Sequence, residues 1–347
     1  MNGIRERLIS SGFSFFRTTG LHRLAAGLTR GAGAILMFHH VRPWVAREFA
    51  PNRLLEITPE FLDAVLARLN ALGFTIVSLD EALKTGRRAE RPFAVLTFDD
   101  GYKDTRDFAL PILERHQAPF TMFVATGFAE RTARLWWVEL EEAIRRLPQI
   151  AVEIDGVKIA LPSATTAEKY AAFAQLYWRL REGPEEVLLD VIGRLAATAG
   201  IDSAALAGDL CLDWAGIEEM ARHKLCTIGV HTLTHPRLAK LSEANMRHEI
   251  VESRRLIEAH IGRLAEHLSF PVGDRASAGE REVRAAAELG FASAVTTRPG
   301  MIFPEHESHR TALPRLSING TWQSLDAVEI LLSGVPFALW NRGRRVA

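Results

Sequence analysis

Four short apolar runs stand out along this chain of 347 residues, and each has the length and composition of a buried β-strand. They are rich in β-branched and aromatic residues and contain no charged residue. Runs of this kind, bounded by turn signals, are typical of strands buried inside a sheet. The four predicted strands cover residues 34–38, 93–98, 120–125 and 226–230.

Between the third and fourth runs the pattern changes to a helical period, so we expect a mainly helical interruption there. Its Asp155-Gly156 pair is a strong turn signal and predicts a hairpin over 152–159. A helix starting near Asp213-Trp214 should lead back to the strands, and helical periodicity returns at 324–332 before a tail over 337–340. Further helices are predicted over 135–147, 166–181 and 184–199.

Two carboxylates follow the second apolar run directly, in Thr97-Phe98-Asp99-Asp100-Gly101. Neighbouring side chains on an extended segment point in opposite directions, so both acids can serve one site only if the chain is already turning. Gly101 permits such a turn. One carboxylate could then bind a cation while the other stays free as a base.

Two histidines follow the fourth run, in His231-Thr232-Leu233-Thr234-His235. The spacing resembles the helical motif of zinc proteases, but Thr232 stands where that motif needs a glutamate, and Pro236 disfavours helical geometry at His235. We therefore expect a turn at the end of a strand. Two neutral imidazoles and one carboxylate leave a fourth position open for water, which is the pattern of catalytic zinc. The alternative is that these histidines and aspartates merely end strands.

These residues carry a resemblance to the NodB-homology polysaccharide deacetylases, carbohydrate esterase family four, over residues 33–127 and 213–318. Thr97-Phe98-Asp99-Asp100 matches the family's first motif, and His231-Thr232-Leu233-Thr234-His235 matches its second. The resemblance implies an α/β fold, a distorted (β/α) barrel of about seven strands, and removal of N-acetyl groups from aminosugar polymers. It also implies that Asp99 is the general base and that Asp100, His231 and His235 bind a divalent metal.

The resemblance divides the chain into a barrel and three other segments. The expected boundaries are an N-terminal amphipathic helical segment over 1–33, a NodB-like barrel over 34–127 and 213–320, a helical insertion over 128–212, and a C-terminal helix and tail over 321–347.

The family's third motif, Arg-x-Pro-x-Gly, is only partly matched, by Ser269-Phe270-Pro271-Val272-Gly273. Pro271 and Gly273 are in register, so we expect a tight turn that aims the Val272 N–H at the oxyanion. Ser269 replaces the arginine that in much of the family pairs with the catalytic base, and this loss would change the pKa of Asp99. Arg315, in the expected last strand, is the candidate substitute.

The family's last motif, Leu-x-His, supplies a general acid, but this chain has Leu316-Ser317-Ile318 there. His306 and His309 are close in sequence, yet their polar surroundings predict solvated side chains. His39 follows the first strand, at the end that forms the catalytic face in barrels, and is the candidate for acid or substrate contact. We expect the adjacent His40 to face away.

The insertion lies where substrate contacts would form, so Trp136, Trp137 and Trp214 are candidate platforms for stacking on sugars. The alternative is that they fill the joint between insertion and barrel. Tyr170, Tyr177 and Trp178 recur along one helix and are predicted to be core residues.

Composition narrows the partners and the compartment. The chain has 42 basic and 42 acidic residues and is 48% apolar, so net charge gives no reason to expect nucleic acid as a partner. Cys211 and Cys226 form no metal or disulfide signature and are expected to be small buried residues. We find no signal peptide and no membrane span, which predicts a cytoplasmic protein.

The basic N-terminal segment adds one alternative, a peripheral contact with a membrane surface. The segment contains five arginines and one acidic residue, Glu6. They are Arg5, Arg7, Arg17, Arg23 and Arg30. A similar contact is conceivable for the C-terminal tail, which ends in Arg342, Arg344 and Arg345, although packing against the barrel is the simpler interpretation.

Three functions fit the residues. The first is a metal-dependent hydrolase of an N-acetylated glycan polymer, oligosaccharide or precursor. The second acts on a small non-sugar amide or on O-acetyl groups with the same site. The third is a silent glycan-binding relative, against which the intact Asp99 argues. Zinc suits the ligand set best, and Co²⁺, Ni²⁺ and Fe²⁺ bind such sites too.

Overall fold

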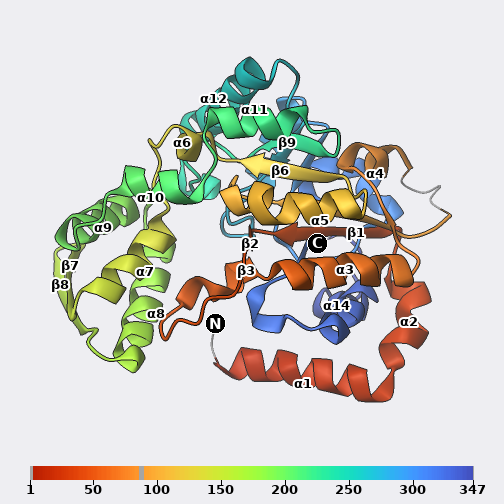
Figure 1. Cartoon of the computed structure of the whole chain (residues 1–347), viewed down its shortest axis with the longest axis horizontal. Helices are drawn as coiled ribbons and strands as arrows, with labels where there is room; N and C mark the ends of the chain where they lie inside the picture. The colour runs from red at the N-terminus through yellow and green to blue at the C-terminus, as the bar shows by residue number, and fades with distance from the viewer. Residues whose placement is uncertain (1–2, 86–89, 347) are drawn as a thin grey trace.

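A computed structural model describes residues 3–85 and 90–346 of the chain, and a parallel β-sheet forms its centre (Figure 1). The strand order is β11-β10-β9-β6-β5-β1-β12, and a short strand, β4, also pairs with β5. The strands are β1 (Gly33–Phe38), β4 (Thr75–Ile76), β5 (Phe93–Phe98), β6 (Phe120–Val124), β9 (Cys226–Val230), β10 (His267–Ser269), β11 (Ser293–Val295) and β12 (Leu316–Ser317).

The two ends of this sheet approach each other, and an isolated β-bridge joins them. Val295 of β11 pairs in parallel with Leu313, which lies three residues before β12. The Leu313 N–H donates to the Ala294 carbonyl at 2.9 Å, and the Thr296 N–H donates to the Leu313 carbonyl at 2.9 Å. The fold is therefore a distorted seven-stranded (β/α) barrel with one extra strand, which confirms the expected fold class.

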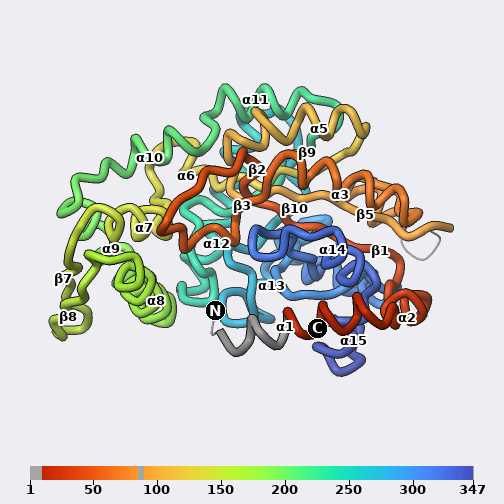
Figure 2. The backbone as a smooth tube through the Cα atoms, turned by 60° about the horizontal axis from the view of Figure 1, so that its bottom comes forward, coloured from red at the N-terminus to blue at the C-terminus, as the bar shows by residue number. Residues whose placement is uncertain are grey.

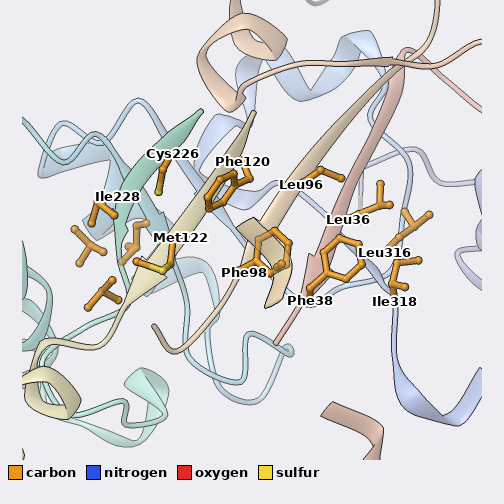
Figure 3. Close-up of a cluster of buried hydrophobic side chains, with 14 of the residues drawn as sticks. Leu36, Phe38, Leu96, Phe98, Phe120, Met122, Cys226, Ile228, Leu316 and Ile318 are labelled. Atoms are coloured by element: carbon orange, nitrogen blue, oxygen red, sulfur yellow. The ribbon is translucent and has the colours of Figure 1, made fainter. Parts of the chain in front are cut away.

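Alternate residues along the strands build two apolar layers, as the two-residue period of a strand requires. The inner layer contains Ile35, Val95, Phe123 and Val295. The outer layer lies side by side across the sheet in Figure 3 and includes Leu36, Phe38, Leu96, Phe98, Phe120, Met122, Cys226, Ile228, Leu316 and Ile318.

The outer layer packs against a ring of helices. These are α3 (Pro59–Ala71), α5 (Leu110–Arg115), α11 (Trp214–Arg222), α12 (Glu243–Ile261), α13 (Glu280–Glu288) and α14 (Leu325–Leu332). A shorter helix, α4 (Leu79–Thr85), packs beside β5, and β2 (His40–Val41) pairs with β3 (Glu56–Ile57).

The insertion has a hydrophobic core of its own and projects from one side of the barrel (Figure 1). The predicted hairpin and its helices are present, and Asp155 and Gly156 both have positive φ, as the turn requires. Two helices, α6 and α10, were not predicted. The elements are α6 (Thr126–Ala129), α7 (Trp136–Arg146), β7 (Gln149–Ile154), β8 (Val157–Pro162), α8 (Thr166–Glu182), α9 (Glu185–Thr198) and α10 (Ser203–Leu210).

Both terminal segments are helical. The N-terminal segment forms α1 (Gly3–Thr19) and α2 (Leu21–Thr29), separated by Gly20 at a φ of 67°. The expected C-terminal tail is instead a helix, α15 (Val335–Trp340), so that expectation was wrong. None of the helices in the described ranges is long and apolar enough to span a bilayer.

Candidate active site

The motifs singled out in the sequence meet at one end of the barrel because parallel strands point the same way. Asp99 and Asp100 follow β5, His231 follows β9, and Ser269 ends β10. The carboxyl ends of parallel strands lie at the same edge, where barrels place their chemistry. Arg315 reaches the same point from the inner face, immediately before β12.

The backbone turns sharply at each motif. The sequence suggested a left-handed turn at Gly101. Asp100 has a φ of 71°, so the turn begins one residue earlier. Thr232 and His235 also have positive φ, of 66° and 61°. This conformation costs a non-glycine residue roughly 1–2 kcal/mol. At Asp100 it lets two adjacent carboxylates face one site with different neighbours.

Asp100, His231 and His235 form a cluster with the dimensions of a metal site. The Asp100 Oδ1 atom is 3.4 Å from Nε2 of each histidine, and the three ligand atoms all lie within 4.8 Å of one another. Tetrahedral ligands at about 2.1 Å from zinc are about 3.4 Å apart. All three side chains are buried, and within the described residues Asp100 Oδ1 has no hydrogen-bond partner. The donor set therefore fits a divalent cation.

Neighbouring groups orient these ligands. Nδ1 of His231 is 2.7 Å from the Ser269 carbonyl, to which it donates, so Nε2 is the free ligand atom. Glu249 of α12 holds the loop between the histidines: its carboxylate accepts from the Leu233 N–H at 3.0 Å and the Thr234 N–H at 2.8 Å. Sequence analysis missed Glu249, since a glutamate on an amphipathic helix carries no distinguishing signal.

Arg315 binds Asp99 through a two-pronged ion pair inside the barrel. Its Nη1 is 2.8 Å from Asp99 Oδ1, and its Nη2 is 2.7 Å from Oδ2. The guanidinium also donates to Ser269 Oγ at 3.0 Å and Thr97 Oγ1 at 3.1 Å, and its Nε donates to the Thr296 carbonyl. Arg315 thus pairs with the Asp99 carboxylate in place of the arginine that the family motif would have at position 269.

The charges of the site keep its acids ionised. Burial acts to raise the pKa of Asp99, but the charge of Arg315 and its hydrogen bonds to the carboxylate outweigh burial and hold that pKa below its ordinary value. Burial likewise opposes ionisation of Asp100, yet the neighbouring imidazole rings of His231 and His235 lower its pKa strongly. Burial lowers the pKa of His235 to about 4, which leaves its ring neutral at pH 7 as a metal ligand requires.

The loop after β10 has the tight turn expected from Pro271 and Gly273. Val272 and Gly273 both have a φ of 61°, and Thr297 holds the loop by donating from its hydroxyl to the Val272 carbonyl at 2.7 Å. Within the described part of the chain, the Val272 N–H has no hydrogen-bond acceptor. The loop therefore presents a backbone donor available to a ligand.

The histidines outside the cluster have different surroundings. His39 is half-buried after β1, and burial lowers its pKa, an effect that the nearby carboxylates of Asp100 and Asp99 oppose. His40 points away, as expected: it is buried, 2.6 Å from Asp104 Oδ2 and stacked on Tyr102.

His306 is not solvated, contrary to expectation. It is 3% exposed, because its Nδ1 accepts from the Phe303 N–H in a short turn, whereas His309 is exposed as predicted. His306 lines a cavity of about 550 Å³ at the opposite end of the barrel, together with Ile35, Leu79, Phe93, Ile302 and Leu313. That cavity includes none of the candidate site residues.

Two of the three tryptophans proposed as sugar platforms are buried in packing contacts, and the third, Trp214, is half-buried. Trp136 and Trp137 are 5% and 6% exposed, and the Trp137 ring lies 4.9 Å from that of His235. Trp214 is stacked on His260 in the last turn of α12. Trp136 and Trp137 therefore present no open face in this structure, because each fills a joint between elements.

The prediction for the aromatic residues of α8 was wrong at two positions. Tyr170 and Trp178 are 42% and 45% exposed, since α8 turns only part of its surface to the insertion core. Tyr177 is half-buried, as expected for packing, and lies 5.3 Å from Trp136. Both cysteines are buried and unpaired, as predicted.

Ion pairs tie the insertion to the two loops that carry site residues. Arg237, two residues after the second histidine, is buried against Glu185 of α9 at 2.9 Å. Arg181 of α8 is 2.6 Å from Asp274, which directly follows the motif's glycine. The turn between α8 and α9 therefore braces both loops.

Comparison with known proteins identifies the family. A model of the family described as polysaccharide deacetylase matches residues 86–294, more than half of the chain. The chain therefore belongs to the polysaccharide deacetylase family and is an enzyme of that class, which confirms the resemblance noted in the sequence. Among curated proteins, none matches this chain significantly.

Solved structures of low sequence identity share the fold. The Streptococcus pyogenes deacetylase PplD, determined in complex with acetate, is 18% identical with a TM-score of 0.57, and the match covers 87% of this chain and 97% of PplD. The putative polysaccharide deacetylase BA0330 from Bacillus anthracis is 16% identical with a TM-score of 0.54, over 86% of this chain and 68% of the other. IcaB from Ammonifex degensii is 16% identical with a TM-score of 0.52, over 87% and 98%.

Proposed function

We propose that this protein is a metal-dependent hydrolase that removes N-acetyl groups from an N-acetylated aminosugar polymer, oligosaccharide or glycan precursor. One observation carries the proposal. A buried carboxylate, Asp99, is held by Arg315 beside a second carboxylate and two imidazoles arranged as a metal site. A site built only for binding would have no need of an ionised carboxylate next to a complete ligand set.

Asp100, His231 and His235 would hold the cation, with zinc the best fit to two imidazoles and one carboxylate. A bound divalent cation lowers the pKa of its water toward ~7 and so supplies a nucleophile at neutral pH. The three protein ligands leave a position for that water. Co²⁺, Ni²⁺ or Fe²⁺ would suit the same atoms.

Asp99 would act as the general base. The pKa of Asp99 is held below its ordinary value by Arg315 against the effect of burial, so the carboxylate is ionised and able to accept a proton at neutral pH. The two hydrogen bonds from Arg315 fix its orientation. Arg315 thus serves as a positioning residue for the base.

The remaining steps would use the Val272 N–H and His39. Attack on an amide carbonyl places negative charge on its oxygen, and the free Val272 N–H could donate to it; one such donor is typically worth about 2.7–4 kcal/mol. The departing amine needs a proton, which His39 would provide from the end of β1. Trp137 would support His235 rather than contact sugar, because its ring is buried against that histidine.

Acetate release from a panel of acetylated compounds tests this proposal. Zinc-loaded protein should release acetate from N-acetylated glycans, and chelation followed by zinc should abolish and restore release. Release from O-acetylated glycans or from small non-sugar amides alone would contradict the N-acetyl assignment. Glycan binding without acetate release from any compound would favour the silent relative.

The predicted cytoplasmic location and the predicted membrane contact of the N-terminal segment are independent of this reaction. The membrane contact involves a different surface of the molecule and needs a separate test.

A further inference from the structure

Helix α2 turns its large apolar side chains outward. Leu24 and Leu28 are 83% and 84% exposed, the two highest values among large apolar residues of the described chain, and Leu21 is 46% exposed. Their spacing places them along one face of the helix. The opposite face is buried through His22 and Ala26, the reverse of what burial of apolar surface would favour.

This arrangement is held firmly. Arg23 of α2 and Arg68 of α3 both bind Glu329 of α14 at 2.7 Å, and the Thr29 hydroxyl donates to the Ser333 carbonyl at 2.6 Å. The helix is therefore anchored by its polar and small residues, and its leucines are left outward by the packing of the whole segment.

Helix α15 packs against α2 and adds to the same region. It buries Val335 and Phe337 but leaves Leu339 and Trp340 66% and 56% exposed. Figure 2 shows α1, α2 and α15 together at the lower right, across the molecule from the insertion. We call Leu21, Leu24, Leu28, Leu339 and Trp340 the α2–α15 patch.

The chain segments that form the α2–α15 patch carry charge of one sign. Residues 10–30 and 335–346 contain six arginines and no aspartate or glutamate. Within the described residues, Arg17, Arg342 and Arg344 form no ion pair, whereas Arg345 pairs with Glu305. The chain as a whole is neutral, so this local excess of positive charge is not a consequence of composition.

We propose that the α2–α15 patch docks this protein on the surface of an anionic phospholipid bilayer, with the leucines in the interfacial layer and the arginines among the headgroups. An apolar helix face flanked by arginines, with a tryptophan at its edge, has the chemistry of an interfacial anchor. A neutral soluble partner would give the arginines no counterpart, and a second copy would bring like charges together.

Vesicle co-sedimentation tests the docking directly. The full-length protein should bind phosphatidylcholine vesicles that contain phosphatidylglycerol and bind pure phosphatidylcholine far less. The double variant Leu24→Ser/Leu28→Ser should lose at least on the order of ten-fold in partitioning. The variant Arg342→Gln/Arg344→Gln should lose binding to anionic vesicles, on the order of five-fold per arginine, and raising the salt concentration should have the same effect.

The matched control is Leu264→Ser, since Leu264 is 67% exposed and follows α12 on another part of the molecule. It should bind vesicles like the wild type, and all variants should keep the wild-type thermal midpoint. Equal binding of wild type and the double leucine variant would overturn the proposal. So would no binding of the wild type, including the case in which the leucines instead mediate a concentration-dependent dimer.

Discussion

The ion pair between Arg315 and Asp99 is the residue-scale feature on which the proposed chemistry depends. Both side chains are buried, so removing the Arg315 guanidinium leaves Asp99 as a buried carboxylate without its main cationic partner. The position of Arg315 could be anticipated because the last strand alternates: Leu316 and Ile318 face the helices, and Arg315 therefore faces inward.

Replacing Arg315 by Met should move the acid limb of the kcat/KM profile to higher pH. The cation favours the charged form of Asp99, so its loss raises the pKa of that carboxyl. In the wild type, the stability contributed by ionised Asp99 is present above its ordinary pKa of 3.8 and is lost as pH falls through the lowered folded value. Arg315→Lys keeps the charge and should shift the limb less. An unchanged limb in Arg315→Met would contradict the assignment of Asp99 as base.

Restoring the family's arginine at position 269 should be harmful in this chain. Ser269 Oγ lies 3.0 Å from Arg315 Nη2, so Ser269→Arg would bury a second guanidinium beside the first. We expect a loss of about 3–5 kcal/mol in the free energy of unfolding, partly recovered by Arg315→Ser in the same chain. Urea unfolding of the single and double variants measures this loss of stability. Wild-type stability of Ser269→Arg would show that positions 269 and 315 can both hold a guanidinium, contrary to this prediction.

At the scale of elements, the insertion acts as a brace for the catalytic loops. This role could not be predicted from sequence, because Arg237 and Glu185 lie 52 positions apart and neither belongs to a motif. The wrong expectation for Trp178 and the open question over Trp136 in the sequence have the same origin. Helical periodicity shows which residues share a face, but which face meets the core depends on neighbours that are distant in sequence.

The variant Arg237→Ala should destabilise the protein and weaken metal binding together. Glu185 would remain buried without a partner, which costs about 3–5 kcal/mol, and the loop carrying His235 would lose its anchor, with at least about a ten-fold loss of metal affinity. The control is Arg194→Ala on α9, the helix that carries Glu185. It breaks an exposed pair with Asp190 and should change the free energy of unfolding by about 0.5 kcal/mol or less. Similar losses in both variants would argue against the brace.

At the scale of the whole molecule, the barrel was predictable and its closure was not. The four apolar runs that form β1, β5, β6 and β9 have five or six residues each and carry a clear strand pattern. The strands β10, β11 and β12 have only two or three residues, too few for a period to show, and they were expected from the family resemblance alone. The four principal candidate residues could be predicted because Asp99, Asp100 and His231 come directly after strong strands and His235 lies in the turn that follows β9.

Metal should stabilise the whole fold, since the cluster joins loops from β5 and β9. A ligand present at about 100 times its Kd adds about 2.7 kcal/mol to the free energy of unfolding. Zinc should therefore raise the thermal midpoint of chelator-treated protein, and Asp100→Asn should abolish that rise. If zinc raises the thermal midpoint of Asp100→Asn as much as that of the wild type, the metal binds elsewhere.

The most direct test of the account is acetate release by Asp99→Asn beside the wild type, on an N-acetylated glycan that the wild type deacetylates, with bound zinc measured in both. Asparagine keeps the shape of the side chain and removes its ability to accept the proton. We predict that the variant binds zinc like the wild type and releases no acetate above background. Wild-type rates of acetate release from zinc-loaded Asp99→Asn would contradict it.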